Sequence, residues 1–213
     1  DAVSIEKISD STYRLGVHIA DVSHYVREDE VLDSEAYERG TSIYLVDRVI
    51  PMLPQRLSNG ICSLNPSVDR LTLTVFIDYK LSEKNGIEAV DHEIIKSVIR
   101  SNHRLTYDEV YEILVEGNKS LREEYSDFIE ELEIMNDLRH RLRKKRFSEG
   151  SIDFNFPEVK VDLDENGKPA ALKKRRHGIP EQLIEEFMIA ANEVVAADMS
   201  WREIPFIYRV HDQ

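Results

Sequence analysis

The residues of this chain that could do chemistry are mostly carboxylates. Aspartate and glutamate make up 41 of its 213 residues. A glycine-rich phosphate loop, a His-Glu-x-x-His pair and a Cys-x-x-Cys pair are all absent from the sequence. Carboxylates that converge on one or two hard cations hold Mg²⁺, which activates water and stabilises charge on a phosphoryl group. Most of these acids must lie on the surface, so only those in a distinctive context are site candidates.

The close spacing of His18, Asp21 and His24 invites a metal or acid–base interpretation, which we reject. His18 and Asp21 stand three residues apart at the end of a predicted strand, and no base–nucleophile partner is evident. We expect a structural histidine whose hydrogen bonds are satisfied. The single cysteine, Cys62, excludes an internal disulfide and a multi-cysteine metal site, and we expect it to be an inert buried thiol.

The stretch from Thr41 to Leu64 is the segment around which we expect the site to be built. It is too apolar for a solvated loop, and Pro51, Pro54 and Gly60 break it too often for one regular element. The two prolines remove backbone donors and fix φ, which predicts a stiff extended bend. We therefore expect this segment to form the wall of a site or to fill a core.

The elements that must position these residues follow from hydrophobic periodicity. Period-2 alternation predicts strands at 2–8, 12–20, 70–81, 87–101, 152–156, 159–163, 170–174 and 206–210. Helices are predicted at 22–26, 121–146 and 181–200. A further helix is predicted between an N-cap at Asp33 and a stop at Gly40, and another begins at a capping box formed by Thr106 and Glu109. The pattern predicts one α+β domain in which an antiparallel or mixed sheet packs with helices.

The charge of the chain is strongly negative, at −13, which argues against a nonspecific nucleic-acid binder. However, two clusters, 139–146 and 173–177, hold ten of the 28 lysines and arginines. They are either nucleic-acid contacts or solvated faces near helix C-termini. No apolar run reaches the roughly 20 residues of a membrane helix, and no signal peptide is evident. Together with the single cysteine, this favours a cytoplasmic protein with no membrane contact.

Four long blocks carry a resemblance to a known family. The blocks are Val17-His-Ile-Ala-Asp-Val-Ser-His-Tyr25, residues 39–54 around Pro-Met-Leu-Pro54, residues 57–66, and Glu185-Glu-Phe-Met-Ile-Ala-Ala-Asn192. They resemble the catalytic RNB domain of the ribonuclease II and ribonuclease R family, and they are closer to ribonuclease R. Residues 1–213 would be the N-terminal and central part of that domain, incomplete at both ends and without a second domain.

The resemblance implies a magnesium-dependent exoribonuclease that degrades single-stranded RNA from its 3′ end to nucleoside 5′-monophosphates. Oligonucleotide-binding domains flank the catalytic domain in such proteins. Asp1 matches the last of four metal-binding aspartates, and the other three would precede it. The family's later Ser-Pro-Ile-Arg-like motif is absent from this sequence. We therefore expect the isolated chain to be inactive.

The same resemblance implies four RNA contacts. Tyr44 and Phe154 would stack on bases near the 3′ end, a contact worth about 1–3 kcal/mol per base. Tyr107 and Glu185 would contact RNA near the active centre, with Glu185 accepting a hydrogen bond from a ribose 2′-hydroxyl. Taken from the residues alone, a core position is favoured for Tyr44 and Phe154, and Glu185 is equally compatible with a solvated helix surface.

An alternative is a non-catalytic RNA-binding or protein-interaction module on the same fold. The sequence immediately before Asp1 in the parent protein discriminates between the two. An Asp-x₅-Asp-x-Asp pattern there indicates the enzyme, and its absence indicates a pseudoenzyme.

Overall fold

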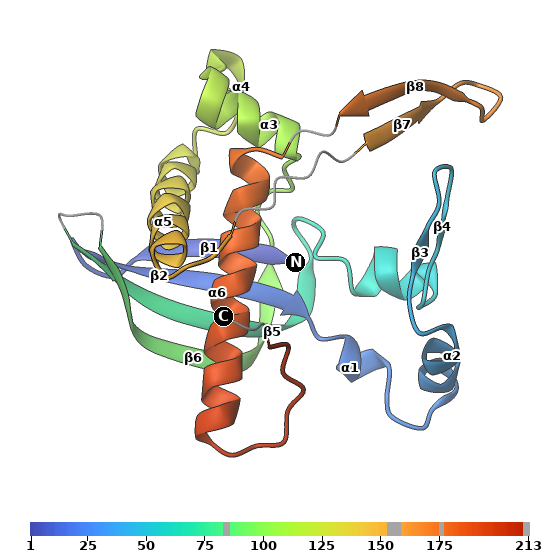
Figure 1. The fold of residues 1–213 in the computed structure, drawn as a ribbon, viewed down its shortest axis with the longest axis horizontal. Helices are drawn as coiled ribbons and strands as arrows, with labels where there is room; N and C mark the ends of the chain where they lie inside the picture. The colour runs from blue at the N-terminus through green and yellow to red at the C-terminus, as the bar shows by residue number, and fades with distance from the viewer. Residues whose placement is uncertain (83–85, 153–158, 175–176, 211–213) are drawn as a thin grey trace.

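A four-stranded antiparallel sheet is the framework of the chain (Figure 1). The computed structural model describes residues 1–82, 86–152, 159–174 and 177–210. The spatial order of the strands is β1 (Ala2–Lys7), β2 (Thr12–Ala20), β5 (Asp69–Leu81) and β6 (Ile87–Arg100). The alternation of apolar and polar residues predicted all four strands, and that prediction is confirmed.

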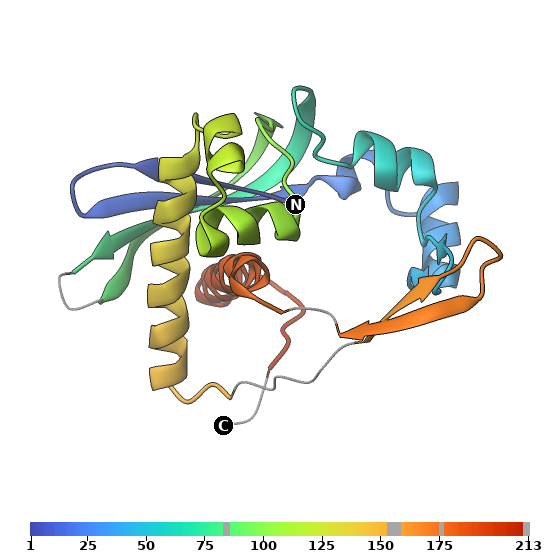
Figure 2. The same ribbon diagram turned by 90° about the horizontal axis from the view of Figure 1, so that it is seen from above.

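One face of this sheet carries the hydrophobic core. Helices α5 (Ile129–Ser148) and α6 (Ile179–Trp201) cover it (Figures 1 and 2). In the paired strands, Leu15 lies opposite Ile77 and Val17 opposite Val75. All four side chains are buried and pack with Leu132, Leu138, Leu183 and Phe187 of the helices. Burying each such side chain contributes about 1.5–3 kcal/mol, so this contact fixes the helices on the sheet.

The helix predicted at 121–146 is broken in two. Helix α4 covers Lys119–Glu124, and α5 begins only at Ile129. Between them, the rings of Tyr125 and Phe128 pack edge to face, and both contact the His103 imidazole. The Tyr125 hydroxyl also donates a 3.2 Å hydrogen bond to Glu109. These contacts to a distant loop outweigh the local helical pattern.

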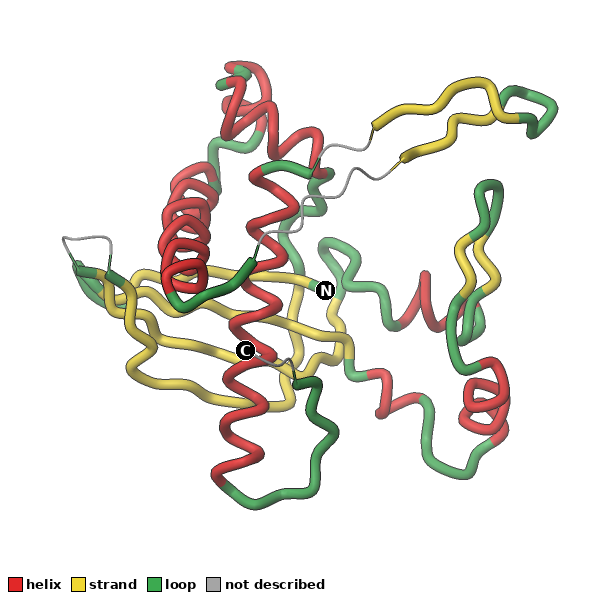
Figure 3. The backbone as a smooth tube through the Cα atoms, viewed as in Figure 1, coloured by secondary structure: helices red, strands yellow, loops and turns green. Residues whose placement is uncertain are grey.

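The central stretch forms a projecting hairpin and one helical turn. Strands β3 (Ile43–Tyr44) and β4 (Val49–Ile50) pair with each other, and a π-helix follows at Arg56–Ile61 (Figure 3). The expectation that this stretch fills a core is wrong for the hairpin, because Tyr44 is 79% exposed and its apolar neighbours are also exposed. The later part of the stretch lies against the body of the domain, since Leu57 is buried and the carbonyls of Gly60 and Ser63 accept hydrogen bonds from Arg70 of β5.

The short helices follow their capping residues. Helices α1 (Val22–Tyr25) and α3 (Tyr107–Tyr111) are present, and Thr106 and Glu109 form the predicted capping box. The π-helix η2 follows at Glu112–Glu116. Helix α2 covers Val31–Arg39 and ends, as predicted, at Gly40, whose φ of 67° suits glycine. The predicted N-cap at Asp33 is wrong: Glu30 is the cap, and Asp33 accepts a hydrogen bond from the Asp29 backbone.

The C-terminal third of the chain matches the predicted secondary structure only in part. Strands β7 (Val159–Leu163) and β8 (Pro169–Lys174) pair as a hairpin, as predicted, on the same side of the molecule as β3–β4 (Figures 1 and 2). The strand predicted at 206–210 is wrong, because no described strand lies beside this exposed segment. Of the strand predicted at 152–156, Ile152 is irregular and the rest lies outside the described residues. In the part of the chain that the structure describes, no helix is long and apolar enough to cross a membrane.

Candidate nucleic-acid interface

A cavity of about 810 Å³ lies at one end of the sheet. Because neighbouring strands are antiparallel, the start of β1, the loop before β5 and the end of β6 all reach this end. They bring together Asp1, Ser63 and the segment 99–107, which line the cavity. Helices α5 and α6 close it with apolar side chains, among them Leu132, Leu183 and Met188.

The polar lining of the cavity mixes acids with cations. Asp1, Asp127 and Glu131 supply carboxylates. The Nε2 atom of His103 lies 2.9 Å from Asp127, and the imidazole stacks on the Phe128 ring with centroids 4.5 Å apart. Arg104 is exposed, and no described residue forms an ion pair with it. An unpaired guanidinium beside carboxylates and aromatic rings suits a phosphate-bearing ligand.

The structure brings together two of the five residues predicted for the site. Asp1 and Tyr107 line the same cavity, and Tyr107 is 44% exposed. Tyr44 lies apart from the cavity lining, on the β3–β4 hairpin, with its ring in solvent. Phe154 lies outside the described residues. Glu185 lies on α6 but not on the side of the helix that faces the cavity.

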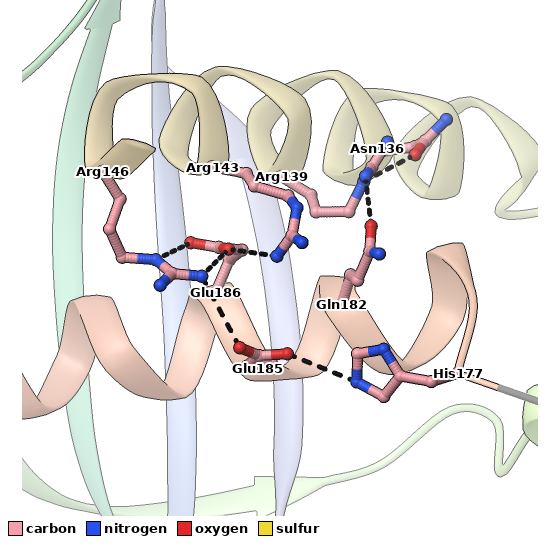
Figure 4. Close-up of polar contacts among 8 residues, drawn as sticks. All are labelled: Asn136, Arg139, Arg143, Arg146, His177, Gln182, Glu185 and Glu186. Atoms are coloured by element: carbon pink, nitrogen blue, oxygen red, sulfur yellow. Dashed lines mark hydrogen bonds and ion pairs between the residues drawn. The ribbon is translucent and has the colours of Figure 1, made fainter. Parts of the chain in front are cut away.

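Glu185 has two nitrogen-bearing neighbours, an arginine and a histidine (Figure 4). Its Oε1 lies 3.5 Å from Arg146 Nη2, and its Oε2 lies 3.5 Å from His177 Nε2. The adjacent Glu186 is only 2% exposed and accepts hydrogen bonds from Arg143 and Arg146. We did not predict Glu186, although a helical period places it with Leu183, Phe187 and Ala190 on the buried face. The sequence signal for Glu186 is a carboxylate on the buried face of α6, opposite a helix rich in arginine.

The family comparison decides what this arrangement belongs to. The family described as the RNB domain matches residues 1–213 of the sequence. The chain belongs to the RNB domain family.

Relatives of this RNB domain are ribonucleases R. "Ribonuclease R 1" of Lactococcus lactis is 46% identical, and ribonuclease R of Thermotoga maritima is 48% identical, each over 100% of this chain. The chain spans 26% and 29% of the length of these two proteins.

The fold agrees with solved structures. RNase R of Mycoplasma genitalium has been solved with double-stranded RNA and with ribose-methylated single-stranded RNA. Each structure is 31% identical with a TM-score of 0.85, covering 99–100% of this chain and 32–36% of the other. Yeast Ssd1, described as a pseudonuclease, shares the fold alone, at 17% identity and a TM-score of 0.68 over 94% of this chain and 23% of its own.

Three arginines of the first basic cluster, Arg139, Arg143 and Arg146, point inward, whereas Lys144 and Lys145 are exposed. Arg139 is 8% exposed and donates to Asn136 and Gln182, while Arg143 and Arg146 pair with Glu186. The hydrogen bonds to Glu186 raise the pKa of Arg146, whereas burial lowers the pKa of Arg139. These arginines join α5 to α6 and are neither a nucleic-acid patch nor a solvated face. In the second cluster, Lys173 pairs with Asp162, and residues 175–176 lie outside the described part.

The His18 region is structural, as predicted. The imidazole is 6% exposed and bonds Ser4 Oγ and Thr74 Oγ1, each at 2.9 Å. Burial lowers the pKa of His18. Asp21 caps α1 and accepts from Ser23, and that hydrogen bond lowers the pKa of the carboxyl. Cys62 is only half-buried rather than buried, and desolvation raises the pKa of its thiol, which keeps the reactive thiolate scarce.

The described residues do not form a magnesium site on their own. Nowhere in the described ranges do three or more His, Cys, Asp or Glu side chains gather closely enough to hold a metal ion. Asp1 places one carboxylate at the cavity, and a Mg²⁺ ion bound there would require further ligands in octahedral geometry.

Proposed function

We propose that this RNB domain is part of the catalytic domain of a 3′-to-5′ exoribonuclease that hydrolyses single-stranded RNA to nucleoside 5′-monophosphates with Mg²⁺. The observation that carries the proposal is the cavity in which Asp1 and Tyr107 meet, in a chain whose whole length matches the RNB family. The ribonuclease R relatives and the RNA complexes of the Mycoplasma enzyme support RNA as the substrate. The single cysteine, Cys62, supports a cytoplasmic location.

Each residue of the site has a proposed role. Asp1 would supply one of several carboxylates for Mg²⁺, whose role is to activate water and neutralise charge at the scissile phosphate. Tyr107 and Arg104 would hold the 3′-terminal nucleotides at the cavity, through the ribose or base and through a phosphate. Tyr44 and Phe154 would stack on bases, and flanking oligonucleotide-binding domains of the parent protein would deliver the strand.

The isolated chain is proposed to be inactive, because its described residues do not gather enough metal ligands. The test compares the 213-residue chain with the longer natural protein that contains it, on 3′-labelled single-stranded RNA. The longer protein should release nucleoside monophosphates and should lose this activity with a chelator or with Asp1→Asn. Chelator-sensitive hydrolysis by the isolated chain would contradict the proposed inactivity. Full activity of Asp1→Asn in the longer protein would contradict the role of Asp1.

A non-catalytic RNA-binding or protein-interaction module is the second candidate. It is favoured by the same lack of a gathered ligand set and by the fold shared with a pseudonuclease, since a fold alone does not fix an activity. The coding sequence upstream of Asp1 distinguishes the two candidates. An Asp-x₅-Asp-x-Asp pattern supports the enzyme, and its absence supports the module.

A further inference from the structure

Arg146 links a buried carboxylate to an accessible one (Figure 4). Its Nε donates to Glu186 Oε2 at 3.1 Å, and its Nη2 donates to Glu186 Oε1 at 2.6 Å. The same Nη2 lies 3.5 Å from Oε1 of Glu185. The Glu186 side chain is 2% exposed, whereas that of Glu185 is 39% exposed.

The buried carboxylate determines where the guanidinium lies. A carboxylate in the interior is tolerated when charged, well-oriented donors satisfy it, and a planar guanidinium bonds both of its oxygens as a fork. Because Glu186 is fixed in the α5–α6 interface, the plane and the Nη2 atom of Arg146 are fixed with it. The cation is thereby presented to Glu185 in one orientation.

Glu185 keeps capacity for another donor. Its contacts with Arg146 and His177 are both 3.5 Å long, beyond the 2.7–2.9 Å of a close charge-assisted hydrogen bond. An ionised carboxylate has about four acceptor positions. A hydroxyl group can therefore bond to Glu185 while Arg146 and His177 remain beside it.

We propose that Arg146 is a positioning residue that orients Glu185 to accept a hydrogen bond from a ribose 2′-hydroxyl. This inference rests on the proposed function and on the RNA contact that the family resemblance implies for Glu185. Lysine cannot replace arginine here, because a single ammonium group does not bond both oxygens of Glu186 as a fork and also lie beside Glu185. Arg146 acts through Glu185 and need not touch the nucleic acid.

The test measures the preference for RNA over DNA of the same sequence, as the ratio of the two Kd values, in the natural protein that contains this chain. Glu185→Gln should reduce the preference about tenfold, because a charged acceptor for the 2′-hydroxyl is lost. Arg146→Lys should also reduce the preference for RNA, while its affinity for DNA should stay within about twofold of that of the unmodified protein. The double variant should lose no more than the larger single effect, since both changes remove one interaction.

Arg141→Lys is the matched control on the same helix. Arg141 pairs with Asp137 and donates to the Ser82 carbonyl, away from Glu185. It should leave the RNA preference unchanged. If the role of Arg146 is purely structural, Arg146→Lys should lower the melting temperature and weaken RNA and DNA binding equally. That result overturns the proposal.

The outcomes distinguish the proposed RNA contact of Glu185 from the positioning role of Arg146. If Glu185→Gln leaves the preference intact, the proposed RNA contact of Glu185 is wrong. If Glu185→Gln lowers it and Arg146→Lys does not, only the positioning role is wrong. Should Arg146→Lys fail to fold, the side-chain Nε–H signal of Arg146 in the unmodified protein replaces it. That NMR signal should shift with RNA and not with DNA, and the absence of a shift with RNA overturns the proposal.

Discussion

Asp1 and Tyr107 line one cavity, although the first directly precedes β1 and the second begins α3. The antiparallel order of the sheet causes this meeting, because it brings the start of β1 and the end of β6 to the same end. The cavity is therefore a direct consequence of the strand order, and the predictions below test what it and its surroundings do.

Removing Arg104 should weaken RNA binding through loss of one phosphate contact. For Arg104→Ala we expect the slope of log Kd against log salt concentration to decrease by about one. Lys7→Ala is the control, since it removes the same charge at the far end of β1. The measurement is a salt titration of RNA affinity by fluorescence anisotropy. Equal slopes for the two variants would exclude a phosphate contact at Arg104.

Truncating Tyr44 should weaken RNA binding without affecting stability. Its side chain is exposed, so Tyr44→Ala should leave the unfolding transition unchanged. If a base stacks on the ring, the variant loses about 1–3 kcal/mol of binding free energy, and Tyr44→Phe retains it. Tyr37→Ala, on α2 and 89% exposed, is the matched control. Unchanged RNA affinity in Tyr44→Ala would show that the hairpin aromatic is not a contact.

Truncating Glu186 should destabilise the domain far more than truncating its neighbour. Glu186→Ala removes a buried carboxylate that two partly buried guanidinium groups share, which costs roughly 3–5 kcal/mol. Glu185→Ala breaks only longer, partly exposed contacts and should cost about 1 kcal/mol or less. Urea unfolding of the chain, followed by circular dichroism, measures both. Similar losses in the two variants would contradict the distinction between them.

Stability should fall as the pH decreases through the range in which an unfolded histidine titrates. Burial lowers the pKa of His18 in the folded chain, so below about pH 6.5 the unfolded chain binds a proton that the folded chain does not. The contribution is fully present above that pH and decreases below it, by up to about 1.4 kcal/mol per pH unit. His18→Gln should reduce this dependence between about pH 7.5 and 5.5. If the urea midpoint shifts with pH by the same amount in His18→Gln and in the unmodified chain, His18 is not the source of the pH dependence.

The sequence predicted those elements whose local pattern agrees with their packing. Strands β2 and β5 alternate because every second residue, such as Leu15, Val17, Val75 and Ile77, packs into the hydrophobic core, and Gly40 ends α2 because it adopts a positive φ. The break at Tyr125 was not predictable in this way, since its cause is a contact with His103 and Glu109 from another loop. Exposure of the β3–β4 hairpin was missed because apolar composition predicts burial, whereas this hairpin projects from the body of the domain.

For the site, the family resemblance identified Asp1 and Tyr107, which the structure places at one cavity. The resemblance did not indicate Glu186, and the apolar periodicity of α6 does not by itself point to an acid on the buried face. The inward orientation of Arg143 and Arg146 depends on the packing of α5 against α6, which the composition of the 139–146 cluster does not reveal.

The central claim is that the 3′ end of an RNA strand enters the cavity beside Asp1. Photo-crosslinking tests it most directly, with 4-thiouridine placed at either the 3′ or the 5′ end of an RNA bound to the natural protein. The account predicts that the 3′ probe attaches to the cavity-lining segments 63–65 and 99–107, and that the 5′ probe does not. Attachment of the 3′ probe only outside these segments, or equal labelling by both probes, would contradict it.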